Sequence, residues 1–431
     1  MKSFRSLTAI CLWISCLMTF SSSAQIADSP AILSKPYTPP LYACMGNSPV
    51  FKNFIQIQQN YIPHNDFTSP LIVPKKIKMR FVVLESNNAK KKADNFRKKD
   101  IKSLKLMVEW LNQFMSELKQ PKRPVREVCG DCYIKDERIR AELVDVIFVN
   151  DTLRPRTKQG LGEDSILNIY LFVDSNKVDK NSKYPNYRFP GAWSYPGGTY
   201  YRGRQQGNLA IYMFNTFLSA KDYPKIDPNM TFNDMLWLET FRLMHEIHHV
   251  LGLGHLQKDN HTNFGFDSGG CDGPDFLADA FPDGCPMTYD DKETINIMNS
   301  ANWSNYLSPL QIARVHRNSF IGQTSRFMYP VESPDKHPWV IDSTQVWDFS
   351  IRLFQNLIIK ENQTLTIKCL LQMPLNSKII LEEGARLIID GGIIDAYHEN
   401  STWKGIQLIN SSDHFSQAVE IINNGQLKGL Q

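Results

Sequence analysis

The chain has 431 residues, of which 42% are hydrophobic and 21% are charged. This length exceeds that of one ordinary domain and predicts two or three domains, with enough apolar residues for a sizeable core. The formal net charge is only +4, from 48 basic and 44 acidic side chains. So weak a positive balance argues against a nucleic-acid-binding protein, which usually carries a strongly basic surface.

The first 24 residues are typical of a secretory signal peptide. Lys2 and Arg5 precede an apolar stretch at residues 7–20, and residues 22–24 form a small-residue cleavage site. The apolar stretch is too short to cross a bilayer, and no later segment reaches the required length. We therefore expect an exported protein without a transmembrane segment, either secreted or at the cell surface.

Export makes disulfide bonds possible, and six cysteines follow the signal peptide. Cys271 and Cys285 enclose a loop rich in Gly, Asp and Pro, and we expect them to form a disulfide bond. Cys129 and Cys132 form either a tight disulfide or a redox or metal pair. The sequence shows neither a βαβ context nor a second C-x-x-C, which favours the disulfide. The remaining two cysteines are Cys44 and Cys369.

Apolar periodicity outlines an ordered region after residues 25–75, which are rich in Pro, Asn and Gln and fit a propeptide or an extended N-terminal segment. The predicted elements, in chain order, are a strand at 78–84, a helix at 99–118, strands at 143–149, 166–173 and 209–214, and helices beginning at 231 and 309. Thr231 and Asp234 have the spacing of a capping box. This order predicts an α/β (α+β) domain with a mixed sheet.

The helix that begins at residue 231 runs into the pattern H-E-x-x-H-x-x-G-x-x-H at residues 245–255. His245 and His249 are four residues apart, so they project from one face of a helix about 6 Å apart along its axis. Gly252 permits the turn that returns His255 as a third ligand. Three imidazoles leave one tetrahedral position for water, which is the layout of a catalytic Zn²⁺ site.

Glu246 lies beside these histidines, where it can reach a metal-bound water and act as a general base. The alternative is a helix that carries surface histidines by chance. A chance match to the extended pattern has a probability of about one in ten thousand in a chain of this length. His248 points away from the metal-binding face, and we expect it to pack against other residues.

A loop rich in aspartate follows the zinc-binding pattern. Its acidic residues are Asp267, Asp272, Asp275, Asp279 and Asp283. Clustered carboxylates suit Ca²⁺, and the commoner alternative is a solvated loop of turns.

From about residue 340 the sequence repeats itself. Residues 359–367 and 381–389 are similar at an offset of about 22 residues, and a looser copy lies at 421–427. Alternating strands at this period predict the coils of a β-solenoid, with a small β-sandwich as the alternative. The chain ends within the third copy, so we expect an incomplete solenoid.

With these elements in place, the sequence resembles the metzincin metallopeptidases, and within them the pappalysin group. The pattern at 245–255 carries most of the resemblance. Residues 168–171 and 191–193 are similar to a strand and loop ahead of the active helix, and residues 308–314 to a helix that follows it. The resemblance covers about residues 75–320 and implies a metzincin-like fold.

The resemblance also assigns roles to residues outside the zinc-binding pattern. It implies that Met298, in Asn296-Ile297-Met298, is the Met-turn methionine beneath the zinc. Met287 is an alternative, and core packing is the other reading of either methionine. Family members commonly have tyrosine where this chain has Ser300, and Tyr306 is a possible substitute near the transition state.

Related enzymes are thought to block their zinc with a propeptide cysteine. Cys44 is the candidate for such a latency cysteine, because thiolate is a good zinc ligand. The alternative is a structural disulfide, for example with Cys369. Residues 340–431 resemble β-solenoid segments attached to exported bacterial proteins.

These features divide the chain into a signal peptide (1–24), an N-terminal extension or propeptide (25–75), a zinc peptidase domain (76–325) and a β-solenoid-like domain (340–431). We expect a secreted zinc endopeptidase that binds a protein or peptide substrate along an edge strand at 209–214. One alternative is an adhesive protein that binds surfaces through the solenoid, although such a protein has no use for Glu246. Another is a zinc amidase that acts on cell-wall peptides.

Overall fold

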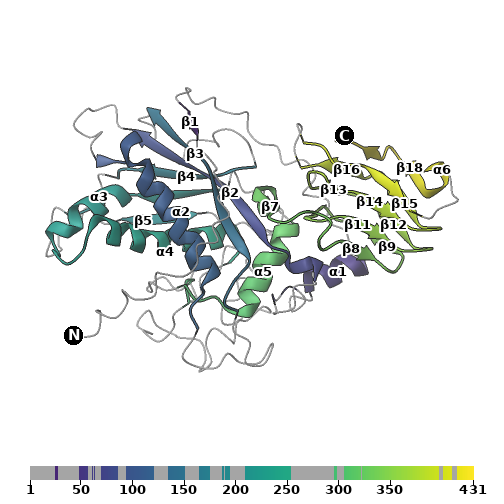
Figure 1. The fold of residues 1–431 in the computed structure, drawn as a ribbon, viewed down its shortest axis with the longest axis horizontal. Helices are drawn as coiled ribbons and strands as arrows, with labels where there is room; N and C mark the ends of the chain where they lie inside the picture. The colour runs from purple at the N-terminus through teal and green to yellow at the C-terminus, as the bar shows by residue number, and fades with distance from the viewer. Residues whose placement is uncertain are drawn as a thin grey trace.

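The computed structural model describes residues 25–27, 48–56, 61, 63, 69–85, 94–120, 134–150, 165–174, 187–188, 190–194, 209–253, 296–298, 305–321, 323–397, 401–409 and 415–431. These residues form two regions, an α/β region and an all-β region, which lie side by side in Figure 1. Among the residues described, no helix is long and apolar enough to cross a membrane.

The α/β region is built on a seven-stranded sheet with the order β1-β3-β2-β4-β6-β5, and β7 pairs with β2. Its strands are β1 (Gln25–Ala27), β2 (Lys75–Glu85), β3 (Ile139–Asn150), β4 (Leu167–Phe172), β5 (Gly191–Ser194), β6 (Ala210–Phe214) and β7 (Met328–Pro330). Strands β5 and β7 are antiparallel to their neighbours and the others are parallel. The predicted mixed sheet in an α/β region is therefore confirmed.

Two details of this sheet differ from the sequence predictions. The predicted edge strand at 209–214 corresponds to β6, which lies between β4 and β5 and is not an edge. The edge is β5, within what the sequence suggested was a loop. The small residue Gly191 explains this difference, because it lies so close to the Phe214 ring that an added Cβ would be 2.2 Å from Cζ.

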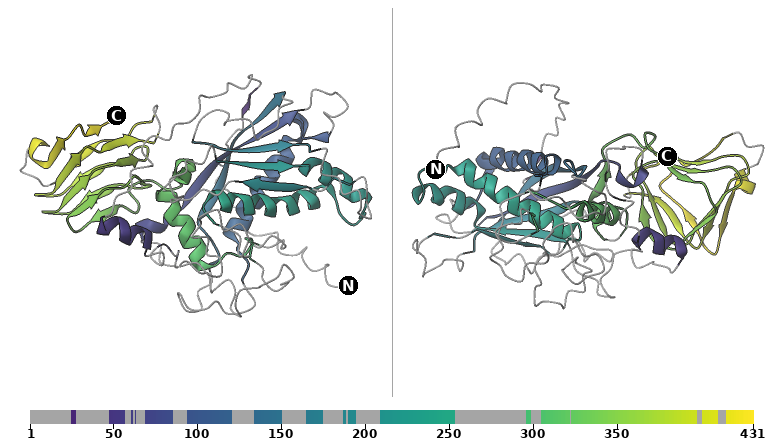
Figure 2. Two further views of the ribbon diagram at one scale, coloured as in Figure 1. Left: turned by 180° about the vertical axis from the view of Figure 1, so that it is seen from behind. Right: turned by 90° about the horizontal axis from the view of Figure 1, so that it is seen from below.

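The helices of the α/β region are α2 (Ile101–Ser116), α3 (Thr216–Asp222), α4 (Phe232–Val250) and α5 (Pro309–Phe320). Helices α1 (Pro49–Gln56) and α6 (Phe415–Ala418) contact strands of the all-β region. Short 3-10 turns lie at η2 (Pro70–Ile72), η4 (Lys98–Asp100), η6 (Tyr223–Lys225) and η8 (Gln323–Phe327). Helices α2 and α4 contact each other, α2 also contacts β3, and α4 contacts β5 and β6. They therefore lie side by side on one face of the sheet (Figure 2).

The all-β region consists of three parallel four-stranded sheets, which the chain visits in turn. One sheet contains β8 (Trp339–Ile341), β11 (Leu357–Ile359), β14 (Ile379–Leu381) and β17 (Ile406–Leu408). The second contains β9 (Gln345–Trp347), β12 (Thr364–Ile367), β15 (Arg386–Asp390) and β18 (Val419–Ile422). The third contains β10 (Ile351–Arg352), β13 (Leu370–Met373), β16 (Ile393–Ala396) and β19 (Gln426–Leu427).

This winding is the coil arrangement of a β-solenoid, and it excludes the β-sandwich, whose sheets are antiparallel. The predicted offset gives the observed register, since Leu365 pairs with Leu387 and Ile367 with Ile389. The alignment of the third copy was wrong. Ile421 pairs with Ile389 rather than with a residue at the start of the repeat, because α6 lengthens the coil before β18.

The two regions share one continuous apolar core. At their junction the Phe320 ring of α5 lies edge-on to Trp339 and Phe354, with centroids 5.5 and 5.1 Å apart. The buried ammonium of Lys75 lies 4.5 Å from the centre of the Phe320 ring. Gln355 also donates a 3.0 Å hydrogen bond to the carbonyl of Pro70. The solenoid is therefore packed directly against the α/β region.

Candidate metal centre

The candidate site is built on α4, whose start is fixed by the expected capping box. The Thr231 hydroxyl accepts a hydrogen bond from the backbone N–H of Asp234, and the Asp234 carboxylate accepts one from the backbone N–H of Thr231 at 2.8 Å. The helix ends just before Gly252, which has a φ of 95°. That conformation is unfavourable for a residue with a side chain, so the predicted role of Gly252 in ending the helix is confirmed.

The histidine spacing places two imidazoles together at the end of α4. The rings of His245 and His249 have centroids 4.5 Å apart and are nearly perpendicular. His245 Nδ1 is 2.6 Å from the carbonyl oxygen of Ile297, and His249 Nδ1 is 2.7 Å from that of Leu253. A carbonyl oxygen only accepts, so each Nδ1 carries a proton, and in the neutral ring each Nε2 has a lone pair with which it could bind a metal.

The chemistry of these donors therefore fits a metal ion such as Zn²⁺. The third predicted ligand, His255, lies outside the described residues. Within the described parts of the chain, no group of three or more His, Cys, Asp or Glu side chains is arranged to hold a metal. The structure thus brings together two of the three predicted ligands.

Glu246 is 5% exposed and points toward the sheet edge. The Ser194 hydroxyl of β5 is 2.7 Å from Glu246 Oε2 and 3.1 Å from the Glu246 main-chain oxygen. Burial raises the pKa of Glu246 to about 7, against the lowering effects of the Ser194 hydrogen bond and the Arg242 charge. No sequence pattern pointed to Ser194, although it directly follows Gly191-Ala192-Trp193, the segment that resembles a metzincin loop.

The segment Asn296–Met298 lies against the end of α4. Its Ile297 carbonyl holds His245, and the Ile297 N–H donates to the Tyr306 carbonyl at 2.9 Å. Met298, the residue after Ile297, is fully buried. The side chain of Tyr306 is also buried, at 3% exposure. The roles of Met298 as a Met-turn and of Tyr306 at the transition state remain predictions, and Met287 lies outside the described residues.

His248 faces away from His245 and His249, as expected. Its Nε2 lies 2.9 Å from Glu137 Oε2, and its Nδ1 lies 2.7 Å from the Met244 carbonyl oxygen. Burial by itself would lower the pKa of His248, but the Glu137 charge and both hydrogen bonds outweigh it, so the pKa is raised. Glu137 is 111 residues away in sequence and belongs to no recognisable motif, which is why sequence reasoning missed it.

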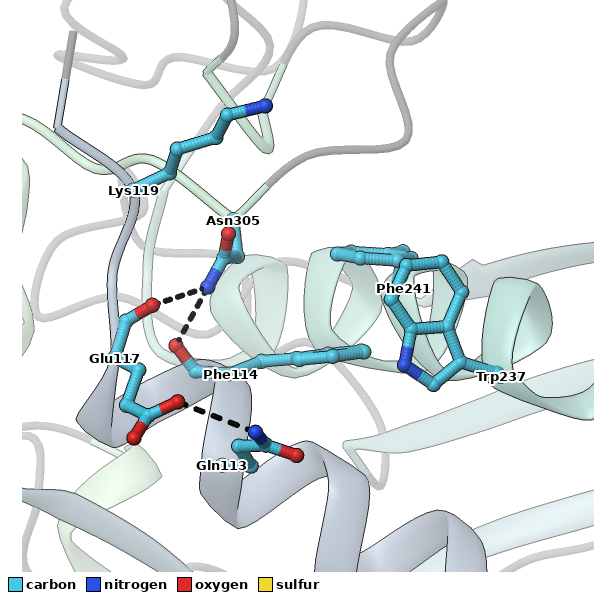
Figure 3. Close-up of a pocket in the computed structure, with 7 residues that line it drawn as sticks. All are labelled: Gln113, Phe114, Glu117, Lys119, Trp237, Phe241 and Asn305. Carbon is cyan, nitrogen blue, oxygen red and sulfur yellow. Dashed lines mark hydrogen bonds between the residues drawn. The ribbon is translucent and has the colours of Figure 1, made fainter. Parts of the chain in front are cut away.

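A pocket of about 250 Å³ lies beside α4, one to two turns before His245 (Figure 3). It is lined by Gln113, Phe114, Glu117, Lys119, Trp237, Phe241 and Asn305. The Phe114 and Phe241 rings stack with centroids 4.1 Å apart, and Trp237 lies edge-on to both. No histidine lines this pocket, so it is a feature of the α2–α4 contact and separate from the candidate metal centre.

Several predictions concern residues outside those described. They are the Cys271–Cys285 disulfide, the Cys129–Cys132 pair, the latency role of Cys44 and the aspartate-rich loop expected to hold Ca²⁺. Cys369 is 3% exposed and disulfide-bonded, and no other cysteine lies among the described residues.

No family model matches the chain, and no curated protein matches it. The resemblance to metzincins therefore rests on the sequence motifs of this chain alone.

Proposed function

We propose that the protein is a secreted zinc-dependent endopeptidase of the metzincin type that acts on proteins or peptides. One observation carries this proposal: His245 and His249 are both held through Nδ1 by backbone carbonyls, beside the buried carboxylate of Glu246. Two such histidines on a metal-binding face, with an acidic residue between them, are the arrangement that the zinc peptidase pattern requires.

His245 and His249 would hold the zinc ion through Nε2, and His255 is the proposed third ligand. When bound, zinc acts as a Lewis acid and lowers the pKa of a coordinated water. The main-chain carbonyls of Ile297 and Leu253 keep both rings in the tautomer that can bind the ion. Such outer partners orient a ligand and raise its basicity.

Glu246 is the proposed general base. Its buried carboxylate, adjacent in sequence to His245, would take a proton from the attacking water. The resulting carboxylic acid then gives that proton to the nitrogen of the leaving amine.

The substrate would bind at β5 rather than at the strand first expected, β6. β5 ends the described part of the sheet, and its Ser194 touches Glu246. An extended peptide that adds to β5 by main-chain hydrogen bonds would therefore lie beside the general base. This geometry supports cleavage within an extended segment of the substrate.

The test is hydrolysis of a denatured protein by the purified mature chain with Zn²⁺ present. Glu246→Gln keeps the shape of the side chain but removes the base, and it should reduce hydrolysis by more than about a hundredfold. Glu109→Gln, an exposed substitution on α2, is the matched control and should keep full activity. If Glu246→Gln hydrolyses the protein as fast as the control, the proposed function is wrong. Release of peptides from cell-wall material but not from protein would favour the amidase instead.

A further inference from the structure

Helix α5 lies between the solenoid and the metal-binding helix α4 (Figure 1). Polar side chains on α5 are buried, although a helix at a domain junction would normally bury apolar ones. Gln311 and His316 are 0% exposed and Asn318 is 1% exposed. Burial of an amide is unfavourable unless its hydrogen bonds are made, so the partners of these side chains indicate what they hold in place.

Gln311 is connected to the candidate metal centre by hydrogen bonds through Asn296. Asn296 Nδ2 donates to Gln311 Oε1 at 2.7 Å, and Gln311 Nε2 donates to Asn296 Oδ1 at 3.3 Å. The same Asn296 Oδ1 accepts from the Met298 N–H at 2.9 Å. The paired amides therefore fix the turn of Asn296–Met298, within which the Ile297 carbonyl must point in one direction.

That direction is toward His245. The 2.6 Å contact between His245 Nδ1 and the Ile297 oxygen sets the tautomer and the rotation of the imidazole ring. Gln311 is anchored in turn, because its Oε1 accepts from the Ser308 N–H at 2.8 Å at the start of α5. A continuous set of hydrogen bonds thus runs from the first turn of α5 to the histidine ring.

Other contacts from α5 brace the same end of α4. Asn318 Nδ2 donates to the Leu251 carbonyl at 2.9 Å, two residues before the carbonyl that holds His249. His316 Nε2 donates to the main-chain oxygen of Glu137 at 2.8 Å, and the Glu137 side chain holds His248. These contacts fix the helix, whereas the Gln311 contacts reach a proposed metal ligand.

We propose that Gln311 is a positioning residue for His245, acting through Asn296 and the Ile297 carbonyl. The proposal rests on the proposed zinc site. Loss of the amide pair would remove two of the hydrogen bonds that hold the Asn296 side chain and would loosen the turn. The His245 ring would then spend part of its time in orientations that cannot bind the metal.

The test measures Zn²⁺ affinity of the full mature chain by competition with a chromogenic chelator, together with the visible spectrum of the Co²⁺-loaded protein. Gln311→Met removes both amide contacts at similar volume, and it should weaken Zn²⁺ binding about 10- to 100-fold and change the Co²⁺ spectrum. Gln311→Glu keeps the acceptor for Asn296 Nδ2 and the Ser308 N–H but puts an oxygen against Asn296 Oδ1, so it should also weaken Zn²⁺ binding, though less than Gln311→Met.

Asp234→Ala is the matched control, because it removes the equivalent capping contact at the far end of α4. It should lower the urea midpoint of unfolding, as the loss of a capping-box contact does, and leave Zn²⁺ affinity unchanged. A role of Gln311 in stability alone would make Gln311→Met behave like this control.

Asn296→Ala removes the same pair of hydrogen bonds by changing the other partner. It tests the proposal if Gln311→Met does not fold. If the wild type binds Zn²⁺ and both Gln311→Met and Asn296→Ala bind it as tightly as the wild type does, Gln311 has no positioning role, although the zinc site itself is supported. If the wild type binds no Zn²⁺, both the proposed function and this inference are wrong.

Discussion

The solenoid and the α/β region place their residues by different means. In the solenoid each strand copies the main-chain register of the strand one coil earlier, and the inward positions are apolar. At the candidate site, position depends on buried side-chain contacts between distant segments. Ser194 meets Glu246 across 52 residues, and Glu137 meets His248 across 111. Repetition therefore stabilises the solenoid, whereas a few polar contacts define the site.

This difference predicts that stability and metal binding can be changed separately. Core substitutions in the solenoid should lower the free energy of unfolding without altering the histidines. Substitutions of the buried polar residues that contact Glu246 or support His245 should change the chemistry of the site more than they change stability.

The largest expected effect is on stability, at Leu387 in the solenoid core. Leu387 is 0% exposed and pairs with Leu365 and Val419 in the adjacent coils. Leu387→Ala should lower the free energy of unfolding by about 3 kcal/mol, because it removes buried methyl groups and leaves a cavity. Urea unfolding measures this loss, and Zn²⁺ affinity should match the wild type.

The neighbouring substitution Ile388→Ala is the control, since that side chain is on the outer, half-buried face of the same strand. It should cost less than half as much as Leu387→Ala. A clear loss of Zn²⁺ affinity in folded Leu387→Ala would contradict the separation of the two regions.

The solenoid could be predicted well because its structure is periodic. The repeat offset gives the pairing of Leu365 with Leu387 because these two adjacent coils stack residue on residue. The prediction fails at Ile421 because α6 interrupts the period, and a sequence offset cannot anticipate an inserted helix.

The site could be predicted only where its residues are close in sequence. His245, Glu246 and His249 follow from helical spacing within one turn. Ser194, Glu137 and Gln311 could not be selected, because each reaches the site through the fold of the chain. The edge position of β5 depends likewise on the pairing order of the sheet.

The second prediction concerns Glu239, a fully buried carboxyl on α4. Burial raises its pKa from 4.5 to about 7, although Arg242, with Nε 3.4 Å from Oε2, opposes the change. The native state thus keeps a proton that the unfolded chain releases, so the contribution of Glu239 to stability is fully present below pH 4.5 and is lost as pH rises through 7. The loss amounts to about 3 kcal/mol by pH 8, since a change of one in pKa corresponds to about 1.4 kcal/mol.

Glu239→Gln should remove this part of the pH dependence. Urea unfolding at pH 5 and pH 8 measures it, and the variant should be more stable than the wild type at pH 8 but similar at pH 5. The exposed Glu109→Gln serves as the control and should retain the wild-type slope. Equal pH slopes for Glu239→Gln and the wild type would mean that Glu239 is ionised in the native state.

The smallest expected effect is at Ser194. Its substitution distinguishes the contact that holds Glu246 from the contacts that position His245. Ser194 donates a 2.7 Å hydrogen bond to Glu246, the proposed general base, whereas Gln311 is proposed to position His245, a proposed metal ligand. Ser194→Ala should lower kcat roughly tenfold, because a hydrogen bond to a charged group contributes about 1.5–3 kcal/mol. Zn²⁺ affinity should not change. Ser194→Thr keeps the hydroxyl and suits a strand, so it should restore most of the activity. If Ser194→Ala weakened Zn²⁺ binding as much as Gln311→Met is expected to, base and ligands would be held by one shared network rather than by two.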